Sequence, residues 1–324
     1  MRKKGNNPFP YSDSNKRYHT YDYFLRNKFG KKVFKVMLDC GFTCPNIDGS
    51  RGVGGCTYCS SRGSGDFAAS DLLSIKEQYE LVRQTMEKKW SGGLCIPYFQ
   101  AHTNTYAPTE VLRKKYYEAL ELPDAVGMSI ATRADCLPDE TVALLREIHE
   151  KTFLTVELGL QSVHDSTAQR INRCHSYEEF LEGYEKLKGL NVCIHIINGL
   201  PGEDHEMMLE TARRVAMLKP HAMKIHLLHV IEGTVMAEQY ARGEFEARSL
   251  EQYVNIVCDQ LEVLSPETVI GRITGDGAQS TLVAPLWSTK KLVVMNEIDK
   301  ELSARESYQG KFFETERSEK NIIL

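Results

Sequence analysis

The strongest constraint on the fold is an alternation of short apolar runs with longer stretches of helical spacing between residues 30 and 230. The apolar runs cover residues 32–38, 94–100, 125–132, 153–160, 191–198 and 222–230. Such runs, each followed by helical spacing, predict parallel β/α units joined by right-handed crossovers. The predicted fold class is therefore α/β, either an open, partial barrel of six units or a doubly wound sheet. In both folds the chemistry gathers beyond the C-terminal ends of the strands.

The alternation stops after residue 230. A helix is predicted over residues 250–264 and a strand over residues 268–274, followed by a polar turn and a segment that contains Pro and Trp. We interpret this part as a small C-terminal α+β appendage. The predicted organisation is a basic and aromatic segment over residues 1–30, a β/α core over residues 31–235 and the appendage over residues 236–324.

Composition and the N-terminal residues predict a cytoplasmic protein with no membrane partner. The chain is 42% hydrophobic and 26% charged, which is typical of globular proteins. It has no apolar run of the roughly 18 residues that a transmembrane helix needs. The N-terminus carries positive charge, but no apolar stretch of a signal peptide follows it.

Charge is distributed unevenly along the chain. Residues 1–35 hold ten basic and two acidic side chains, a local charge of +8, whereas the remaining residues carry −12. Aromatic residues such as Tyr11, Tyr21 and Phe24 lie among these cations. The mixture suits contacts with the phosphates and bases of a nucleic acid. It is also typical of a belt that packs its aromatic side chains inward and leaves its cations in water.

Nine cysteines, an odd number, do not suit a disulfide framework. Four of them, Cys40, Cys44, Cys56 and Cys59, lie within twenty residues after the first predicted strand. Thiolates at this density suit zinc or an iron–sulfur cluster. Only Cys56 and Cys59 have the spacing of a zinc knuckle, and Cys40 ends an apolar run. The sequence therefore favours a [4Fe–4S] cluster with Cys44, Cys56 and Cys59 as ligands, which leaves one iron open.

The cysteine loop LDCGFTCPNIDGSRGVGGCTYC resembles that of the radical S-adenosylmethionine (SAM) superfamily, including the aromatic Tyr58 before the last cysteine. Its eleven-residue spacer is similar to the stretched motif of the elongator catalytic subunit and of related bacterial proteins. The segments YFQAHTNTYAP, ATRADCLP, VELGLQS, HIINGLPGE, KIHLLHV and RITGDG extend the resemblance over nearly the whole chain. The resemblance implies a partial (β/α)6 barrel with a [4Fe–4S] cluster and SAM as cofactors.

The resemblance also implies which residues contact SAM. The residues after the second strand would meet its amino group, Gln161 its ribose and Arg173 its carboxylate. His195 takes the place of a ribose-binding residue, and the backbone around Leu228 would meet adenine. The implied cofactor-binding set is Tyr58, Gln100, Ala101, His102, Thr103, Glu157, Gln161, Arg173, His195 and Leu228.

Two of these residues also have a structural interpretation. Glu157 could be a buried charge at a strand end, paired with Arg133 or Lys224. His195 could be a core histidine whose hydrogen bonds are satisfied within the apolar strand.

The function that the resemblance implies is reductive cleavage of SAM to a 5′-deoxyadenosyl radical, which abstracts hydrogen from a substrate. The stretched loop and the basic segment favour tRNA modification, with tRNA as a partner and flavodoxin or ferredoxin as electron donor. The alternatives are a radical SAM enzyme that acts on a small metabolite or a protein, and a non-catalytic zinc-binding interaction protein.

Overall fold

The computed structural model describes residues 7–63, 68–89, 91–275 and 279–313. Arg2, Lys3 and Lys4 of the basic segment lie outside these residues. The chain forms two compact units, and each is described by itself. The first unit comprises Leu25–Leu160 and Asn172–Cys193, and the second comprises Met1–Phe24, Gln161–Ile171 and Ile194–Leu324.

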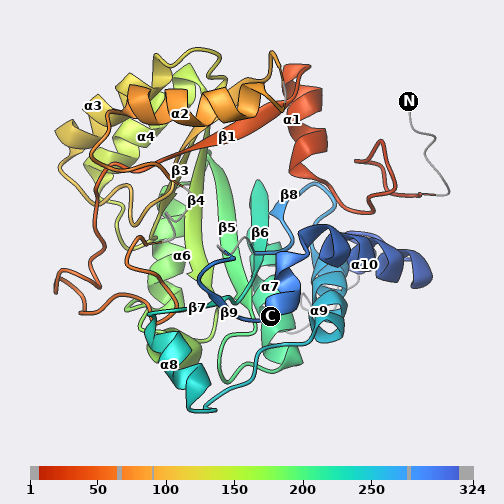
Figure 1. Ribbon diagram of the computed structural model, residues 1–324. Helices are drawn as coiled ribbons and strands as arrows, with labels where there is room; N and C mark the ends of the chain where they lie inside the picture. Colours follow the sequence, from red (N-terminus) through yellow and green to blue (C-terminus); the bar gives the residue numbers. More distant parts are fainter. Residues whose placement is uncertain (1–6, 64–67, 90, 276–278, 314–324) are drawn as a thin grey trace. The chain divides into compact units, whose positions relative to one another are not determined.

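The first unit is built on a parallel β/α alternation. Strand β1 pairs with β2, β2 with β3 and β3 with β4, all in parallel. Helix α2 packs on β1, and α3 packs on β3 (Figure 1). Its elements are β1 (Val33–Leu38), α2 (Ile75–Glu87), β2 (Leu94–Phe99), α3 (Thr109–Leu120), β3 (Gly127–Thr132), α4 (Asp139–Lys151), β4 (Phe153–Gln161) and α6 (Tyr177–Lys186), with α1 (Tyr21–Phe29) crossing its N-terminal boundary.

The strands of the first unit are buried along most of their length, as β2 shows with five buried residues out of six. Strands that are covered on both faces have continuous apolar sequences. These strands can therefore be predicted well from the sequence. Helix α2 begins at Ile75. Ser74 and Glu77 form a capping box there, which satisfies the first amide groups of the helix.

The second unit continues the same architecture. Its elements are α5 (Asp165–Arg170), β5 (Asn191–Asn198), α7 (His205–Leu218), β6 (Ala222–Leu227), β7 (Val230–Ile231), α8 (Val235–Ala241), α9 (Leu250–Val263), β8 (Val269–Arg272), β9 (Leu282–Ala284), the 3₁₀ helix η1 (Leu286–Thr289) and α10 (Lys291–Ala304). Helix α9 packs on α7 and α10. The strand order of the main sheet is β1-β2-β3-β4-β5-β6-β8.

Strand β8 is the seventh strand of that sheet. It lies in the segment that we interpret from sequence as an appendage, and it pairs in parallel with β6 from Ala222 and Val269 onward. The fold class is α/β with a partial barrel, as predicted, extended by this strand. Among the described residues, no helix combines the length and the apolar character that crossing a membrane requires.

The N-terminal segment packs into the second unit. Phe9 and Tyr18 are buried, and the Lys16 ammonium lies 2.5 Å from the Asp299 carboxylate. The Arg17 guanidinium donates to the Ser307 carbonyl at 3.3 Å, and the Gln309 amide N–H donates to the Arg17 carbonyl at 2.9 Å. Phe9, Lys16, Arg17 and Tyr18 therefore make the packing contacts expected of a belt.

Candidate functional site

The cysteine loop follows β1 directly, and its long spacer folds back on itself. The amide of Ile47 donates to the Cys44 carbonyl at 2.9 Å, and Asp48 and Val53 form an antiparallel bridge. Gly54 and Gly55 then have φ angles of +81° and +73°, a left-handed conformation that favours glycine. This hairpin returns the chain toward Cys44. The Cys44 and Cys56 thiols therefore lie near each other, although eleven residues stand between them in the sequence.

Three of the four cysteines of the loop share one environment. The Cys56 and Cys59 thiols are hydrogen-bonded to each other, and Cys44 and Cys56 lie within each other's electrostatic field. Cys40 instead lies in the field of Lys115 and of Asp39. The structure thus groups the three cysteines that we predict as cluster ligands and gives Cys40 different neighbours.

The loop also controls the acidity of these thiols. The hydrogen bond from Cys59 lowers the pKa of Cys56 to about 6 against the opposing effect of burial, and the Arg133 charge adds to the decrease. Burial raises the pKa of Cys40 to about 12 and also raises that of Cys44, although the hydrogen bond between Thr103 and Cys44 acts in the opposite direction. A thiol that ionises near neutral pH, beside two others, suits the thiolate ligation that an iron–sulfur cluster requires.

Two asparagines, which the sequence analysis did not identify, hold the spacer. Asn46 Nδ2 lies 3.3 Å from Cys56 Sγ and 3.0 Å from the Asn172 carbonyl oxygen. Asn172 Nδ2 donates to the carbonyls of Val53 at 3.0 Å and Gly55 at 2.7 Å. A sequence signal exists in each case: Asn46 lies two residues after Cys44, and Asn172 directly precedes Arg173.

A buried ionic network lies after β3. Arg133 binds both carboxylate oxygens of Asp135, at 2.9 and 2.8 Å, and its Nη2 lies 3.1 Å from His175 Nδ1. Burial opposes the ionisation of Asp135, but the hydrogen bond and charge of Arg133 outweigh it and lower the pKa of this carboxyl. Burial, together with the charges of Arg173 and Arg133, lowers the pKa of His175 to about 3.

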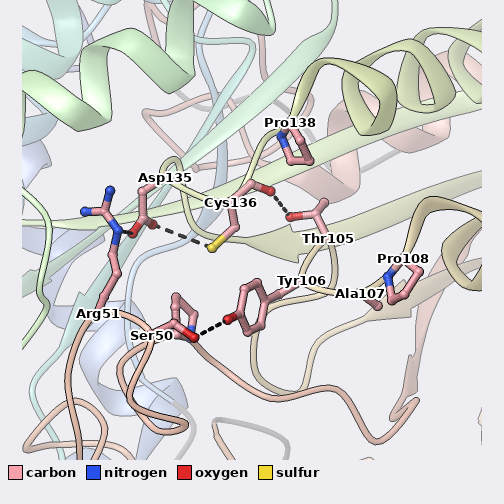
Figure 2. A pocket seen from close by; sticks show the side chains of 10 residues that line it. Ser50, Arg51, Thr105, Tyr106, Ala107, Pro108, Asp135, Cys136 and Pro138 are labelled. Carbon is pink, nitrogen blue, oxygen red and sulfur yellow. Dashed lines mark hydrogen bonds and ion pairs between the residues drawn. The ribbon is translucent and has the colours of Figure 1, made fainter.

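A pocket of about 640 Å³ opens beside the cysteine loop, and the βα loops after β2 and β3 line it (Figure 2). Arg51, on the spacer hairpin, reaches Asp135 at 3.3 Å and Glu179 at 2.5 Å. The Ser50 and Tyr106 hydroxyls lie 2.7 Å apart, which joins the same hairpin to the loop after β2. The remaining lining residues are Pro45, Thr105, Ala107, Pro108, Cys136 and Pro138.

The predicted SAM residues after β2 adjoin the cysteine loop. Thr103 Oγ1 lies 3.0 Å from Cys44 Sγ, and His102 Nδ1 lies 3.9 Å from it. His102 has a φ of +57°, and its amide donates to the Gly63 carbonyl at 2.9 Å. Ala101 is buried, and Gln100 is half-buried. Tyr58 is hydrogen-bonded to Cys56, and burial raises the pKa of its phenol.

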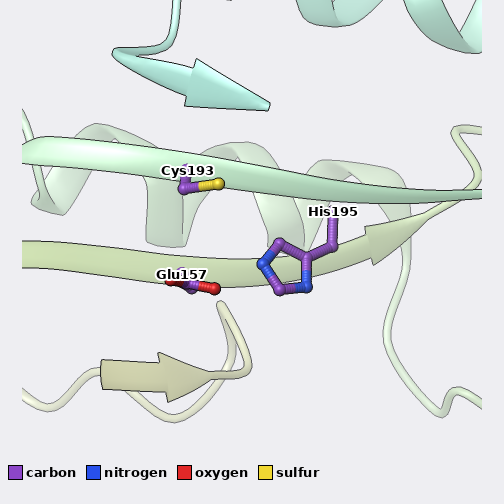
Figure 3. A group of neighbouring side chains, drawn as sticks. All are labelled: Glu157, Cys193 and His195. Atoms are coloured by element: carbon purple, nitrogen blue, oxygen red, sulfur yellow. The ribbon is translucent and has the colours of Figure 1, made fainter. Parts of the chain in front are cut away.

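Glu157 and Arg173 are buried in the first unit. The Glu157 carboxylate pairs with Lys35 of β1, a partner that the sequence analysis did not identify. Figure 3 shows Glu157 on β4 and Cys193 and His195 on β5. Arg173 is 2% exposed, and its guanidinium donates to the Leu160 carbonyl and, at 3.0 and 3.2 Å, to the His175 carbonyl.

The other predicted SAM residues belong to the second unit. Gln161 ends β4 with a φ of +67°. The His195 and His226 rings lie 5.1 Å apart between centroids, tilted by 46°. The Leu228 amide donates to the Asn198 carbonyl at 2.9 Å, which ties the end of β6 to the end of β5.

Comparison with known proteins identifies the superfamily of this chain. Residues 48–215 match the model of the radical SAM superfamily, and residues 220–304 match that of the radical SAM C-terminal domain. The chain is 54% identical to YtqA of Bacillus subtilis over 95% of its own length and 97% of that protein. It is 27% identical to the tRNA uridine(34) acetyltransferase of Methanocaldococcus jannaschii, over 49% of this chain and 30% of that protein.

Among solved structures, the archaeal Elp3 of Methanocaldococcus infernus has the same fold. The TM-score is 0.60 at 20% identity, over 84% of this chain. The match spans 63% of the archaeal chain, so that protein contains a further part that the match does not cover.

Proposed function

The chain belongs to the radical SAM superfamily, and from that premise we propose that it is an enzyme that cleaves SAM reductively at a [4Fe–4S] cluster held by Cys44, Cys56 and Cys59. The observation that carries the proposal is the grouping of these three thiols by the folded spacer, with the Asn46 amide donating to the Cys56 sulfur and the Thr103 hydroxyl hydrogen-bonded to Cys44. Three thiolates fit a four-iron cluster that keeps one iron open for a small-molecule ligand.

Bound there, the cluster would supply the electron that splits SAM into methionine and a 5′-deoxyadenosyl radical for hydrogen abstraction. The residues of the chain hold the ligands and bind the cofactor. Thr103 fixes Cys44, and the charge of Arg133 favours the Cys56 thiolate. We further propose that Gln100–Thr103 serve the SAM amino group, Gln161 and His195 its ribose, the Leu228 backbone its adenine and Arg173 its carboxylate.

We propose tRNA as the substrate class. Support comes from the partial match to proteins named tRNA uridine(34) acetyltransferase, and from the net positive charge of residues 1–35. Electrostatic binding to phosphates would position the RNA, and a base taken out of its stack would present the reacting atom. A ferredoxin or flavodoxin is the proposed electron donor, and the cytoplasm is the proposed location.

Two measurements test this proposal. Anaerobically purified protein should be brown and contain about four irons per chain, whereas a colourless protein with one zinc ion would contradict it. Deletion of the gene should change the mass of one tRNA nucleoside in a digest of total tRNA. An unchanged nucleoside profile beside an intact cluster would instead favour a small-molecule or protein substrate.

A further inference from the structure

We propose that Asn46 is a positioning residue that donates a hydrogen bond to the Cys56 sulfur and thereby raises the reduction potential of the cluster. The inference rests on the proposed function, since it concerns the same three-cysteine loop. It assigns a role to a side chain that binds neither iron nor SAM.

The geometry fixes the orientation of the Asn46 amide. Its nitrogen lies 3.0 Å from the Asn172 carbonyl oxygen and 3.3 Å from Cys56 Sγ. A carbonyl oxygen only accepts hydrogen bonds, so the nitrogen and not the oxygen of the amide must face it. The two N–H groups of one nitrogen are thus matched to two acceptors. Asn46 is 1% exposed, so water does not compete for either contact.

Asn172 connects Asn46 with the end of the spacer. Its φ of +53° lies in the left-handed region, which asparagine tolerates better than most residues. Its side-chain amide binds the carbonyls of Val53 and Gly55, the end of the spacer just before Cys56. The same residue therefore holds the backbone that carries Cys56 and offers its own carbonyl to Asn46.

The electrostatic consequence is a change in redox potential. Reduction adds one negative charge, which is shared by the cluster and its sulfur ligands. An N–H group directed at a ligand sulfur stabilises the reduced state more than the oxidised state, and hydrogen bonds to sulfur are one of the factors that set such potentials. Loss of the Asn46 donor should make the cluster harder to reduce.

The test is a redox titration of the full chain after anaerobic reconstitution, without SAM, with dye mediators and visible absorbance as the readout. Asn46→Leu removes the donor at similar volume and should shift the midpoint potential to a more negative value at unchanged iron content. Asn46→Asp keeps the shape, removes the donor and adds negative charge, so its shift should have the same sign and be larger.

Gln78→Leu is the matched control. Gln78 is also a buried carboxamide near the start of the loop, but its amide donates to the carbonyls of Asp39 at 2.7 Å and Leu73 at 3.0 Å, and not to a sulfur. The midpoint potential of the Gln78→Leu variant should equal that of the wild type. Equal potentials in the wild type and Asn46→Leu at full iron would overturn the inference.

Loss of iron from both Asn46 variants, with Gln78→Leu fully loaded, would also overturn the inference, because the role of Asn46 would then be structural only. A wild-type chain that assembles no cluster would contradict the proposed function itself. The two failures are therefore distinguishable.

Discussion

At the scale of single residues, the cysteines differ in the neighbours of their thiols. We predict that replacement of Cys44, Cys56 or Cys59 by Ala abolishes iron binding, because each removes one of three thiolate ligands. Cys40→Ala should retain iron, since Cys40 lies in the field of α3 residues instead. Iron per chain after anaerobic reconstitution is the measurement. Cys95→Ala is a control, because this buried thiol contacts the Tyr79 hydroxyl and the Pro123 carbonyl rather than the three ligands. Full iron in Cys44→Ala would contradict the ligand assignment.

His175 gives a prediction of pH dependence. Its folded pKa of about 3 lies below the value of about 6.5 in the unfolded chain. Between these values the unfolded state binds more protons, so stability contributed by the neutral ring is present above pH 6.5 and is lost as the pH falls toward 3. The melting temperature should therefore fall less steeply over this range in His175→Gln than in the wild type. Parallel curves for the two proteins would contradict the prediction.

At the scale of elements, the N-terminal segment combines a structural role with a proposed role in binding. The structural role predicts that Phe9→Ala destabilises the protein by about 3–5 kcal/mol, the usual cost of removing a buried aromatic ring. Phe9 is 0% exposed and lies against Tyr11 and Tyr308. Chemical denaturation measures the loss, with Phe312→Ala as control, because Phe312 is 42% exposed. Equal losses in both variants would contradict the packing that the structure shows.

The binding role calls for cations that the fold leaves exposed. Lys16 and Arg17 contact the second unit, whereas Lys28 and Lys31 are exposed. We predict that Lys28→Gln with Lys31→Gln flattens the negative slope of log affinity for tRNA against log salt by up to about 1.8, because each lost phosphate contact contributes at most about 0.9. Lys88→Gln with Lys89→Gln, two exposed lysines after α2, is the control. An unchanged slope in the first variant would favour a substrate other than RNA.

At the scale of the whole molecule, the sequence predicts the strands well because they are apolar on both faces. The start of β1 and the end of β4 fall within one residue of the bounds predicted over 32–38 and 153–160. The place of β8 in the sheet could not be predicted, since its partner β6 lies more than forty residues earlier and pairing leaves no local signal. Within the site, spacing indicated the thiols, but the roles of Asn46 and Asn172 depend on contacts across more than a hundred residues.

The most direct test of the central claim is SAM cleavage by the reconstituted protein under a chemical reductant. The wild type should release 5′-deoxyadenosine and methionine in equal amounts, slowly in the absence of substrate. Cys56→Ala should release neither, whereas Cys40→Ala should behave as the wild type. A brown, iron-loaded wild-type protein that binds SAM and leaves it intact under reductant would contradict the account.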